Sequence, residues 1–509
     1  MNTDTLSSWQ ALGLACAAAA SALSAKYNDR AIFDEHRANI PYKKGYPLLG
    51  GLPFLLGNVL SGHDFTTQTF EELDTLTWTM SSLGIKRNIS TIDPANIEHI
   101  LKDNLQDYIK GPKLQEAFSD LVGEHIFNDH SKKWRYQRKA ANIIFNAMNI
   151  RDHFTAVFVH DLRYMIKEIL NVAAVNREPV DFQDLMYKFT LDSFVQLGFG
   201  VAVNGLQQKG KANFAESFDV LQSNGSWRLV FPIWKLSEAI KPILFPWQTS
   251  IKDHVKAINS YAYEFIAKRK KEMAEGQEPE GFLSRLMNVR DEAGEPSDER
   301  SLRDAILAFF VAGRDTTAGG LSWTFYNLML HPRIENKLFE EIKSHVTDEI
   351  ESDPVALYEA IKKMNYAHAV FYEVLRLYPP LPANIRYALK DDILPDGTHV
   401  RSGDYIVWSL YALGRSTKVW GPDAKDFRPE RWLTPEGEVR RESQAKWPAF
   451  HAGPRSCPGQ KLSTLESLVV VVMLLKRYKF SLVPDQEVTY TLSATLVMHS
   501  GMKVFVEQR

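Results

Sequence analysis

The segment FHAGPRSCPGQ contains Cys457, one of two cysteines in the chain. The other, Cys16, lies in an N-terminal apolar run, so Cys457 is the single thiol of the remaining body. Gly453 and Pro454 predict a turn before Cys457, and the apolar run KLSTLESLVVVVMLLKRY after it predicts a buried helix. Free N–H groups at a helix N-terminus, together with Arg455, stabilise negative charge. We therefore expect a Cys457 thiolate that ligates a metal or attacks a substrate.

A nucleophile and a metal ligand need different partners. A nucleophilic cysteine needs a general base, and no sequence argument brings His451 within reach of Cys457. Two cysteines cannot make a four-thiolate zinc site, and the chain has no HExxH motif. A macrocycle with four nitrogens of its own needs only one axial ligand from the protein. The residues therefore favour a macrocycle-bound metal with Cys457 as its axial ligand over a zinc site or a catalytic thiol.

Two other patterns could do chemistry if they lie on helices. Glu373 and Arg376 are three residues apart, so they can form an ion pair, which on a helix surface is worth under about 1 kcal/mol. Asp315 and Thr316 interrupt a run rich in Ala, Phe and Leu, and such a break often marks function. A helical threonine can instead simply bond a preceding carbonyl.

Trp134 and Arg138 are four residues apart, so both can face the same side of a helix. An arginine in this position can bind a carboxylate with two donors. The same stretch holds further cations, namely Lys132, Lys133, Arg135 and Lys139. These cations form either a solubilising face or a basic docking patch for an acidic electron donor.

Together these patterns resemble the motifs of the cytochrome P-450 superfamily. The haem-thiolate signature of that superfamily is matched by Phe450, Gly453, Arg455, Cys457 and Gly459. Three further superfamily motifs, in the expected order, are matched by Trp134 with Arg138, by the segment Ala312-Gly313-Arg314-Asp315-Thr316-Thr317, and by Glu373 with Arg376. The segment Pro429-Glu430-Arg431-Trp432 resembles the superfamily's Pro-Glu-Arg-Phe motif, with tryptophan in place of phenylalanine.

The resemblance implies a mainly α-helical protein with small β-sheets that binds haem b, iron protoporphyrin IX. It makes Cys457 the axial iron ligand. It places the other cofactor contacts at Arg455, Trp134, Arg138, Phe450 and Gly459. The implied activity is a monooxygenase that inserts one atom of O2 into an unactivated C–H bond of a lipophilic substrate, since thiolate ligation favours O–O cleavage.

The resemblance also implies roles for residues that do not touch the iron. It assigns Thr316 to the oxygen pocket and Asp315 to a proton relay. It predicts a buried structural cluster of Glu373, Arg376 and Arg431, which would hold the loop that leads to Cys457. Removing one member of such a cluster would leave a buried charge unpaired.

The elements that position these residues can be predicted from local signals. Ser297 and Asp298 are good caps for a long helix that begins near residue 301, and His331-Pro332 ends it. A second helix spans 365–377 and stops at Pro379-Pro380, and short strands follow between 398 and 413.

The N-terminal segment WQALGLACAAAASALSA has no charge and is mostly small and apolar. It predicts a membrane anchor or, alternatively, a secretory signal. Lys26 and Arg30 follow the segment and no cation precedes it, which favours an anchor with the body in the cytosol. We therefore expect an anchor (1–30), a Pro/Gly-rich hinge (31–58) and a catalytic domain (59–509), attached to the endoplasmic reticulum membrane by a single pass.

The composition excludes several classes of protein. The chain has 509 residues, with 60 Lys and Arg against 62 Asp and Glu, so it is not a basic nucleic-acid-binding arm. No dinucleotide fingerprint is convincing, because Gly198-Phe-Gly200-Val-Ala-Val203 lacks the third glycine and more simply ends a helix. A monooxygenase of this kind would take electrons from a separate NADPH–cytochrome P-450 reductase on the same membrane.

The sequence constrains the substrate less than it constrains the cofactor. The stretches LRDAILAFFVAGRDTT, FHAGPR and LYALGRS resemble the fungal and plant branch that hydroxylates the ends of fatty-acid and alkane chains, and the anchor and hinge suit its fungal members. Phe309, Phe310 and Val311 could line a narrow channel, although core packing explains them equally well. Departures from the branch pattern at 124–134 and after Arg138 keep open a tailoring oxidation of a polyketide or terpenoid in fungal secondary metabolism.

Two further classes remain. A haem-thiolate isomerase or dehydratase would use a peroxide without O2 and would need no proton relay, so the pair of Asp315 and Thr316 argues against it. A non-catalytic haem-binding protein would need neither the relay nor a reductase.

Overall fold

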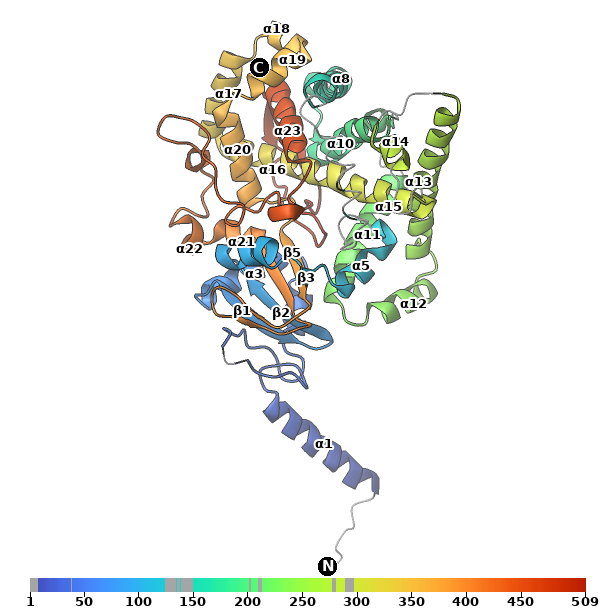
Figure 1. Ribbon diagram of the computed structural model, residues 1–509, viewed down its shortest axis with the longest axis vertical. Helices are drawn as coiled ribbons and strands as arrows, with labels where there is room; N and C mark the ends of the chain where they lie inside the picture. Colours follow the sequence, from blue (N-terminus) through green and yellow to red (C-terminus); the bar gives the residue numbers. More distant parts are fainter. Residues whose placement is uncertain are drawn as a thin grey trace, which may run out of the picture.

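A computed structural model describes residues 8–37, 39–123, 134, 138, 150–200, 203–208, 213–276, 281–288 and 297–509. Within these residues the protein is mainly helical and has three small sheets, as expected. Figure 1 shows the larger sheet at the end of the body nearest α1 (Ser8–Lys26), with most helices stacked on the other side.

The described helices follow one another along the chain. The first half holds α2 Leu52–Gly57, α3 Gly62–Glu72, α4 Pro94–Glu98, α5 Pro112–Val122, α8 Thr155–Met165, α9 Asn171–Asn176, α10 Phe182–Phe199, α11 Asn213–Val230 and α12 Trp234–Leu244. The second half holds α13 Ile251–Ala274, α14 Gly281–Asn288, α15 Glu299–Phe310, α16 Thr316–Leu330, α17 Pro332–His345, α18 Asp348–Ser352, α19 Pro354–Ile361, α20 Asn365–Leu377, α21 Leu410–Arg415, α22 Thr417–Trp420 and α23 Gln460–Leu475.

The larger sheet has five strands in the order β1-β2-β8-β5-β3. These strands are β1 Thr77–Ser82, β2 Ile85–Thr91, β3 Tyr108–Ile109, β5 Ala383–Ala388 and β8 Tyr405–Ser409. The hairpin β1–β2 is antiparallel, and β8 joins β2 in parallel. The two smaller sheets combine β4 Val180–Asp181 with β10 Lys503–Gln508 and β9 Tyr478–Leu482, and β6 Asp392–Ile393 with β7 His399–Val400.

The Pro/Gly-rich segment before the body packs directly on the larger sheet. Tyr42 bridges to Thr79 and Gly50 bridges to Ser82. Gly50 has φ +59°, and a Cβ on it would lie 2.1 Å from the Ser81 carbonyl oxygen, so the chain can approach the strand here only as glycine. The hinge is therefore held against β1 by backbone hydrogen bonds.

The predicted long helix crosses the middle of the body (Figure 1). It begins at α15, where the Asp298 side chain accepts the N–H of Ser301 at 2.7 Å, and ends with α16 just before Pro332. Between the two lies a π-helical turn, η5 (Val311–Asp315), which the sequence analysis did not predict. Single π turns inside α-helices often occur at functional sites.

The other predicted helices are confirmed, and one strand prediction is partly wrong. Helix α20 has the expected bounds, and α23 is buried along nearly its whole length. Strands β7 and β8 lie within 398–413, but Leu410–Arg415 is helix α21 because Ser409 caps it by accepting the N–H of Ala412. Gly200 ends α10 with φ +68°, as the missing third glycine suggested.

Helix α1 projects from the body in Figure 1. Across the described part of the chain, no helix combines the length and the hydropathy that a membrane crossing requires.

Candidate active site

A tight loop positions Cys457 at the start of α23. The N–H of Cys457 donates to the carbonyl of Phe450 at 2.8 Å, which closes the loop. Gly453 has φ +63°, and a Cβ there would lie 2.5 Å from the Leu101 carbonyl oxygen, so the turn requires glycine. At Gly459 a Cβ would meet only the Cys457 sulfur, at 3.8 Å, so a larger side chain would fit there. This position acts through its backbone N–H, which donates a hydrogen bond to Cys457.

The Cys457 side chain is accessible, yet protein surrounds it closely enough for burial to raise the pKa of the thiol. The N–H groups of Gly459 and Gln460 and the charge of Arg138 oppose that rise. The expectation that the helix N-terminus and Arg455 together lower this pKa is therefore wrong, because desolvation outweighs the donors. A bound metal cation would reverse the balance, since a thiol that coordinates a metal loses its proton.

Buried cations gather beside this loop. Arg386 of β5 is 1% exposed, its Nη2 donates to His451 Nε2 at 3.0 Å, and its Nε has no hydrogen-bond partner among the described residues. Burial and Arg455 lower the pKa of Arg386 to about 9. Burial and the same two arginines hold the pKa of Lys110 well below its ordinary value. Buried cations that repel one another create a strong site for an anion.

His451 belongs to this cation cluster rather than to a catalytic pair with Cys457. Burial, Arg386 and Lys110 keep the His451 pKa well below its ordinary value, so the ring is neutral. Its Nδ1 lies 3.3 Å from the Ala452 carbonyl oxygen and can donate to it, which leaves Nε2 as the acceptor for Arg386. A neutral ring that already accepts one hydrogen bond offers no base to the thiol.

The two predicted residues before this region meet the loop. The Arg455 guanidinium lies 3.9 Å from the centre of the Trp134 ring, a cation–π contact. Arg138 is near enough to Cys457 for their charges to interact. The neighbouring cations Lys132, Lys133, Arg135 and Lys139, and the unusual segments at 124–133 and after Arg138, lie outside the described residues.

The π turn η5 arranges Asp315 and Thr316. Thr316 Oγ1 donates to the Ala312 carbonyl at 2.6 Å, the local bond that the alternative interpretation predicted. Thr190 of α10 donates to the Arg314 carbonyl at 3.0 Å and so satisfies a backbone group of the turn. A Cβ on Gly313 would lie 2.1 Å from the Phe194 ring, so glycine lets α10 approach this closely.

Asp315 is 1% exposed and belongs to an ion-pair chain. Arg314 Nη1 lies 2.8 Å from Asp315 Oδ1 and 2.7 Å from Asp219 Oδ1 of α11. Burial raises the pKa of Asp315 to about 7, although Arg314 opposes the rise. The Asp219 side chain is 35% exposed, so the chain connects the turn with solvent.

The accessible side chains around the turn are not those expected. Phe309 and Phe310 are buried, and Phe310 packs against Phe214 and Phe199. The idea that these two phenylalanines line a channel is therefore wrong, because their rings pack against neighbouring helices and do not face an open space. Val311, Ala312 and Thr316 keep partial exposure in the middle of the body.

A family model for cytochrome P-450 matches residues 41–504. The chain belongs to the cytochrome P-450 family. It is 32% identical over 505 residues to cytochrome P-450 704B1 of Arabidopsis thaliana, covering 92% of this chain and 94% of that protein, and 34% identical over 505 residues to cytochrome P-450 704C1 of Pinus taeda, with the same coverage. It is 31% identical over 473 residues to cytochrome P-450 monooxygenase cyp1 of Mycosarcoma maydis, covering 90% of this chain and 72% of that protein.

Cytochromes P-450 are monooxygenases that bind haem b, and the residues present fit that cofactor. The loop offers an accessible thiol for the iron. Beside it, the unsatisfied Arg386 Nε and the mutually repelling cations suit a group with negative carboxylates. Cys457 would ligate the iron, and Arg386, Arg455, Arg138 and Lys110 would hold the propionates, with Trp134 supporting Arg455.

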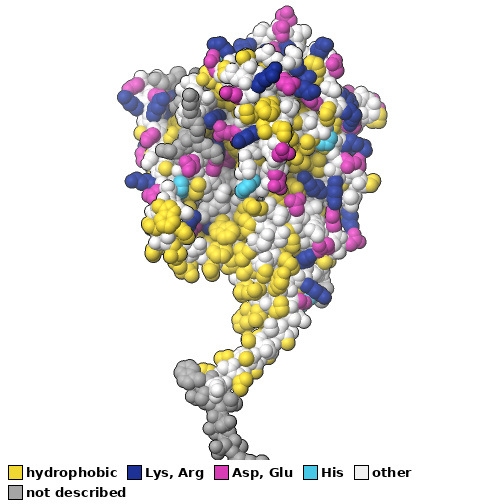
Figure 2. All heavy atoms as spheres, turned by 180° about the vertical axis from the view of Figure 1, so that it is seen from behind, with side chains coloured by type: hydrophobic (Ala, Val, Ile, Leu, Met, Phe, Trp, Pro, Cys, Tyr) yellow, Lys and Arg dark blue, Asp and Glu magenta, His cyan; other side chains and the backbone are white. Residues whose placement is uncertain are grey.

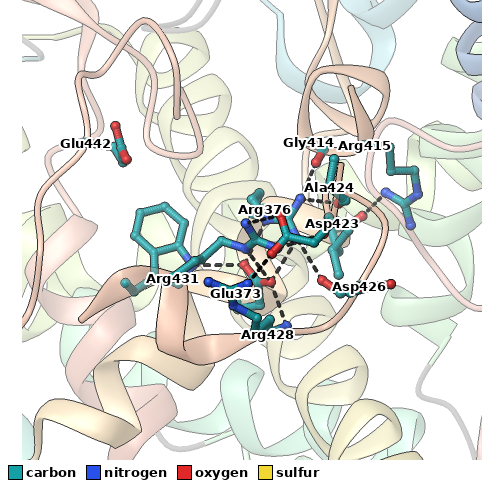
Figure 3. A network of polar contacts seen from close by, with 12 residues as sticks. Glu373, Arg376, Gly414, Arg415, Asp423, Ala424, Asp426, Arg428, Arg431 and Glu442 are labelled. Carbon is teal, nitrogen blue, oxygen red and sulfur yellow. Dashed lines mark hydrogen bonds and ion pairs between the residues drawn. The ribbon is translucent and has the colours of Figure 1, made fainter. Parts of the chain in front are cut away.

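The buried cluster expected of a cytochrome P-450 is present in full (Figure 3). Arg376 donates through Nε and Nη2 to the two carboxylate oxygens of Glu373, at 2.7 and 2.8 Å, and both side chains are 0% exposed. Arg431 Nε adds a bond of 2.9 Å to Glu373 Oε1. The surface-pair interpretation of Glu373 and Arg376 is therefore wrong. Arg376 also donates to the carbonyl of Asp426, which ties the segment before Arg431 to α20.

The tryptophan that replaces the family's usual phenylalanine has a specific contact. Trp432 Nε1 donates to Glu373 Oε2 at 2.9 Å, a bond that phenylalanine cannot make. Together with the backbone N–H of Arg428, Glu373 accepts hydrogen bonds from four residues.

Sequence reasoning missed two residues of the cofactor region, Lys110 and Arg386, and the hydrogen bond from Arg386 to His451. Arg386 lies in a strand of alternating pattern and Lys110 stands alone before Gly-Pro, so neither carries a motif. Only the sheet order, which places β3 beside β5, brings the two cations to one edge.

Proposed function

We propose that this cytochrome P-450 hydroxylates a long apolar chain, of the fatty-acid or alkane type, at or near its terminal carbon. The observation that carries the proposal is the character of the side chains accessible beside η5. Val311 and Ala312 are partly exposed, small and aliphatic, and Thr316 adds one hydroxyl. Such a surface suits a narrow alkyl end and offers no charge to a bulky polar substrate.

The haem would activate O2, and the chain's own residues position the substrate and supply the protons. We assign the supply of protons to Asp315, whose pKa of about 7 lets it exchange a proton near neutral pH. Arg314 holds that carboxylate, and the partly exposed Asp219 offers a contact with solvent. Thr316 presents a hydroxyl beside the same turn. These assignments disfavour an isomerase or dehydratase, which would need no proton source.

We propose that the protein is attached to the endoplasmic reticulum membrane by two surfaces. Helix α1 is uncharged until Lys26 and alanine-rich, so a second contact would strengthen its attachment. Large apolar side chains are exposed along α12 and at both of its ends, namely Ile233, Leu236, Ile240, Ile243, Leu244, Phe245 and Trp247. Figure 2 shows hydrophobic side chains gathered at the end of the body from which α1 emerges. We propose that the electron donor is a separate NADPH–cytochrome P-450 reductase on the same membrane.

Optical titration of the ferric holoenzyme tests the substrate class. We expect a low-spin to high-spin shift with fatty acids, alcohols and alkanes, and tighter binding as the chain lengthens. A shift produced only by aromatic polyketides or terpenoids would overturn the proposal in favour of a tailoring oxidation.

A second measurement tests the proton assignment. Asp315→Asn should lower the product formed per NADPH consumed and change the pH profile, while substrate still shifts the spin state. An unchanged pH profile and yield would remove Asp315 from the mechanism. Failure of the reductase with NADPH to reduce the folded holoenzyme would support a non-catalytic haem protein.

A further inference from the structure

A separate cavity of about 190 Å³ lies between the larger sheet and helices α2 and α3. Its floor is one face of three neighbouring strands. Trp78 of β1 stands opposite Ser90 of β2, and Ser90 stands opposite Val407 of β8. Met80 stands opposite Asn88 one step further along the hairpin. Side chains directly opposite in adjacent strands share a face, so the register assembles this floor.

Aromatic rings and glycine shape the roof of the cavity. Phe54 of α2 and Phe65 of α3 stack with ring centres 5.6 Å apart, and both line the cavity. Gly51 precedes α2, and a Cβ on it would lie 2.2 Å from the Met80 sulfur, so glycine allows α2 to sit this close to the floor. The roof and floor are therefore a built site rather than a surface depression.

The polar side chains that line this cavity are neutral; Asn58 and Thr66 of its roof bond to backbone carbonyls, whereas three polar groups of its floor have no partner among the described residues. Trp78 is 4% exposed, and its buried Nε1 has no hydrogen-bond partner among the described residues. The described structure likewise shows no side-chain hydrogen bond for Asn88 or Ser90, which line the same cavity. An unpaired N–H donor in an apolar enclosure is costly unless a ligand satisfies it. These three groups can satisfy a hydroxyl or an ester carbonyl.

No described residue that lines the cavity carries a charge. Lys43 lies near the roof, with its Nζ 5.9 Å from the Phe54 and Phe65 ring centres, and is ion-paired with Glu72. Glu72 therefore already neutralises Lys43. An ionised carboxylate in such an enclosure would lose its hydration without gaining a counter-charge.

Two walls of the cavity continue toward η5. Val230, the last residue of α11, lines the cavity, and Asp219 eleven residues earlier reaches Arg314. At the rise of an α-helix this separation is about 16 Å. Leu492 lines the opposite wall, and three residues later Thr495 accepts a hydrogen bond from Gln222 of α11 at 2.8 Å. Helix α11 and the segment from Leu492 to Thr495 therefore link the cavity wall to side chains near the π turn.

We propose that this cavity binds the polar end of the chain-like substrate, and that this end is a neutral alcohol or ester rather than a carboxylate. The inference rests on the proposed chain hydroxylation and deepens it by naming the substrate class. Trp78 donates to the neutral end group, Asn88 and Ser90 complete its hydrogen bonds, and the alkyl chain extends toward Val311 and Ala312. Strands β1 and β2 and helix α3, whose residues line the cavity, lie at the end of the body nearest α1, where a lipid would enter (Figure 1).

The test compares four ligands of one chain length with the full-length holoenzyme at pH 8. Hexadecan-1-ol, methyl hexadecanoate, hexadecane and hexadecanoate are titrated, and the dissociation constant is taken from the spin-state shift. We expect the alcohol and the ester to bind about three- to tenfold tighter than both the alkane and the carboxylate, the range of one or two neutral hydrogen bonds.

Two variants distinguish binding through hydrogen bonds from binding to an apolar surface. Asn88→Leu and Trp78→Phe should weaken the alcohol and the ester by about three- to tenfold and leave the alkane unchanged. Asn88→Lys should selectively tighten the carboxylate. Lys86 occupies β2 two positions before Asn88, so Lys86→Met tests whether that cation recognises the carboxylate.

Each outcome decides the proposal. Carboxylate binding as tight as alcohol binding overturns the neutral-end inference but leaves chain hydroxylation standing, and a loss of that binding in Lys86→Met would identify the cation responsible. Equal weakening of alkane and alcohol in Asn88→Leu overturns the assignment of Asn88. A holoenzyme that binds none of the four chains overturns both the inference and the proposed function.

Discussion

Replacing Trp432 with phenylalanine would remove one donor from the fully buried carboxylate of Glu373. A hydrogen bond to a charged group contributes about 1.5–3 kcal/mol. Arg376 Nε still donates to the same oxygen, Oε2, so the carboxylate keeps a partner and the loss should fall in the lower half of that range. The smaller ring removes about 1 kcal/mol of packing in addition. We therefore expect Trp432→Phe to lower the free energy of unfolding by about 2.5–3 kcal/mol.

Trp420 supplies a matched control for this substitution. Its ring centre lies 5.6 Å from that of Trp432, but its buried Nε1 has no hydrogen-bond partner among the described residues. Trp420→Phe makes the same chemical change and should cost only about 1 kcal/mol, because no hydrogen bond is lost and the phenylalanine ring still offers a face to Arg376 and Lys446, which lie over the Trp420 ring. The difference between the two variants isolates the bond to Glu373.

The assay is urea unfolding of both holoenzyme variants and the wild type, followed by circular dichroism. The haem-thiolate spectrum of each variant confirms that Cys457 is still a ligand before unfolding. We expect the midpoint for Trp432→Phe to lie well below that for Trp420→Phe. Equal midpoints would refute the reasoning, because the bond from Nε1 to Glu373 would then add nothing to the bonds from Arg376 and Arg431.

Three other substitutions test separate parts of the structure. Burial raises the pKa of Glu466 to about 8, so the folded state holds a proton there that the unfolded state releases above about pH 4.5. Wild-type stability should fall as pH rises from about 5 to 8, and in urea titrations across that range Glu466→Gln should make this slope shallower by the contribution of one carboxyl group, leaving that of Asp315. Gly313→Ala should lower the stability of the protein by about 1–3 kcal/mol, because the new Cβ meets the Phe194 ring. The control Gly319→Ala should not destabilise the protein, because a Cβ there would meet no described atom outside its own helix within 4 Å. Equal thermal midpoints for the two variants would contradict this reasoning. Arg386→Met should speed the loss of haem to an apoglobin acceptor while the exposed control Arg401→Met should not, and matching rates would remove Arg386 from the propionate site.

Local sequence signals determined much of this protein. The cap at Asp298 and the stop at Pro332 correctly bounded the central helix, and apolar periodicity and prolines correctly bounded α20. These predictions succeed because caps, prolines and helical spacing act within a few residues. The loop around Cys457 is predictable for the same reason, since Gly453 and the following helix impose it locally.

The tertiary structure alone decided which groups are buried and which charges meet. Glu373 and Arg376 could have formed a weak surface pair, and only packing against the segment that carries Arg431 and Trp432 makes the pair a buried network. The raised pKa of Cys457 likewise reflects desolvation by distant segments, which outweighs the adjacent helix N-terminus.

The same reason explains the residues that carry no motif. Arg386 and Lys110 come together because β3 and β5 are neighbours in a sheet whose strands are far apart in the chain. The cavity floor of Trp78, Ser90 and Val407 depends on the register of three strands. Burial and strand pairing are sums over contacts between remote residues, so a local pattern identifies a chemistry but cannot say which side chains the fold will bring to it.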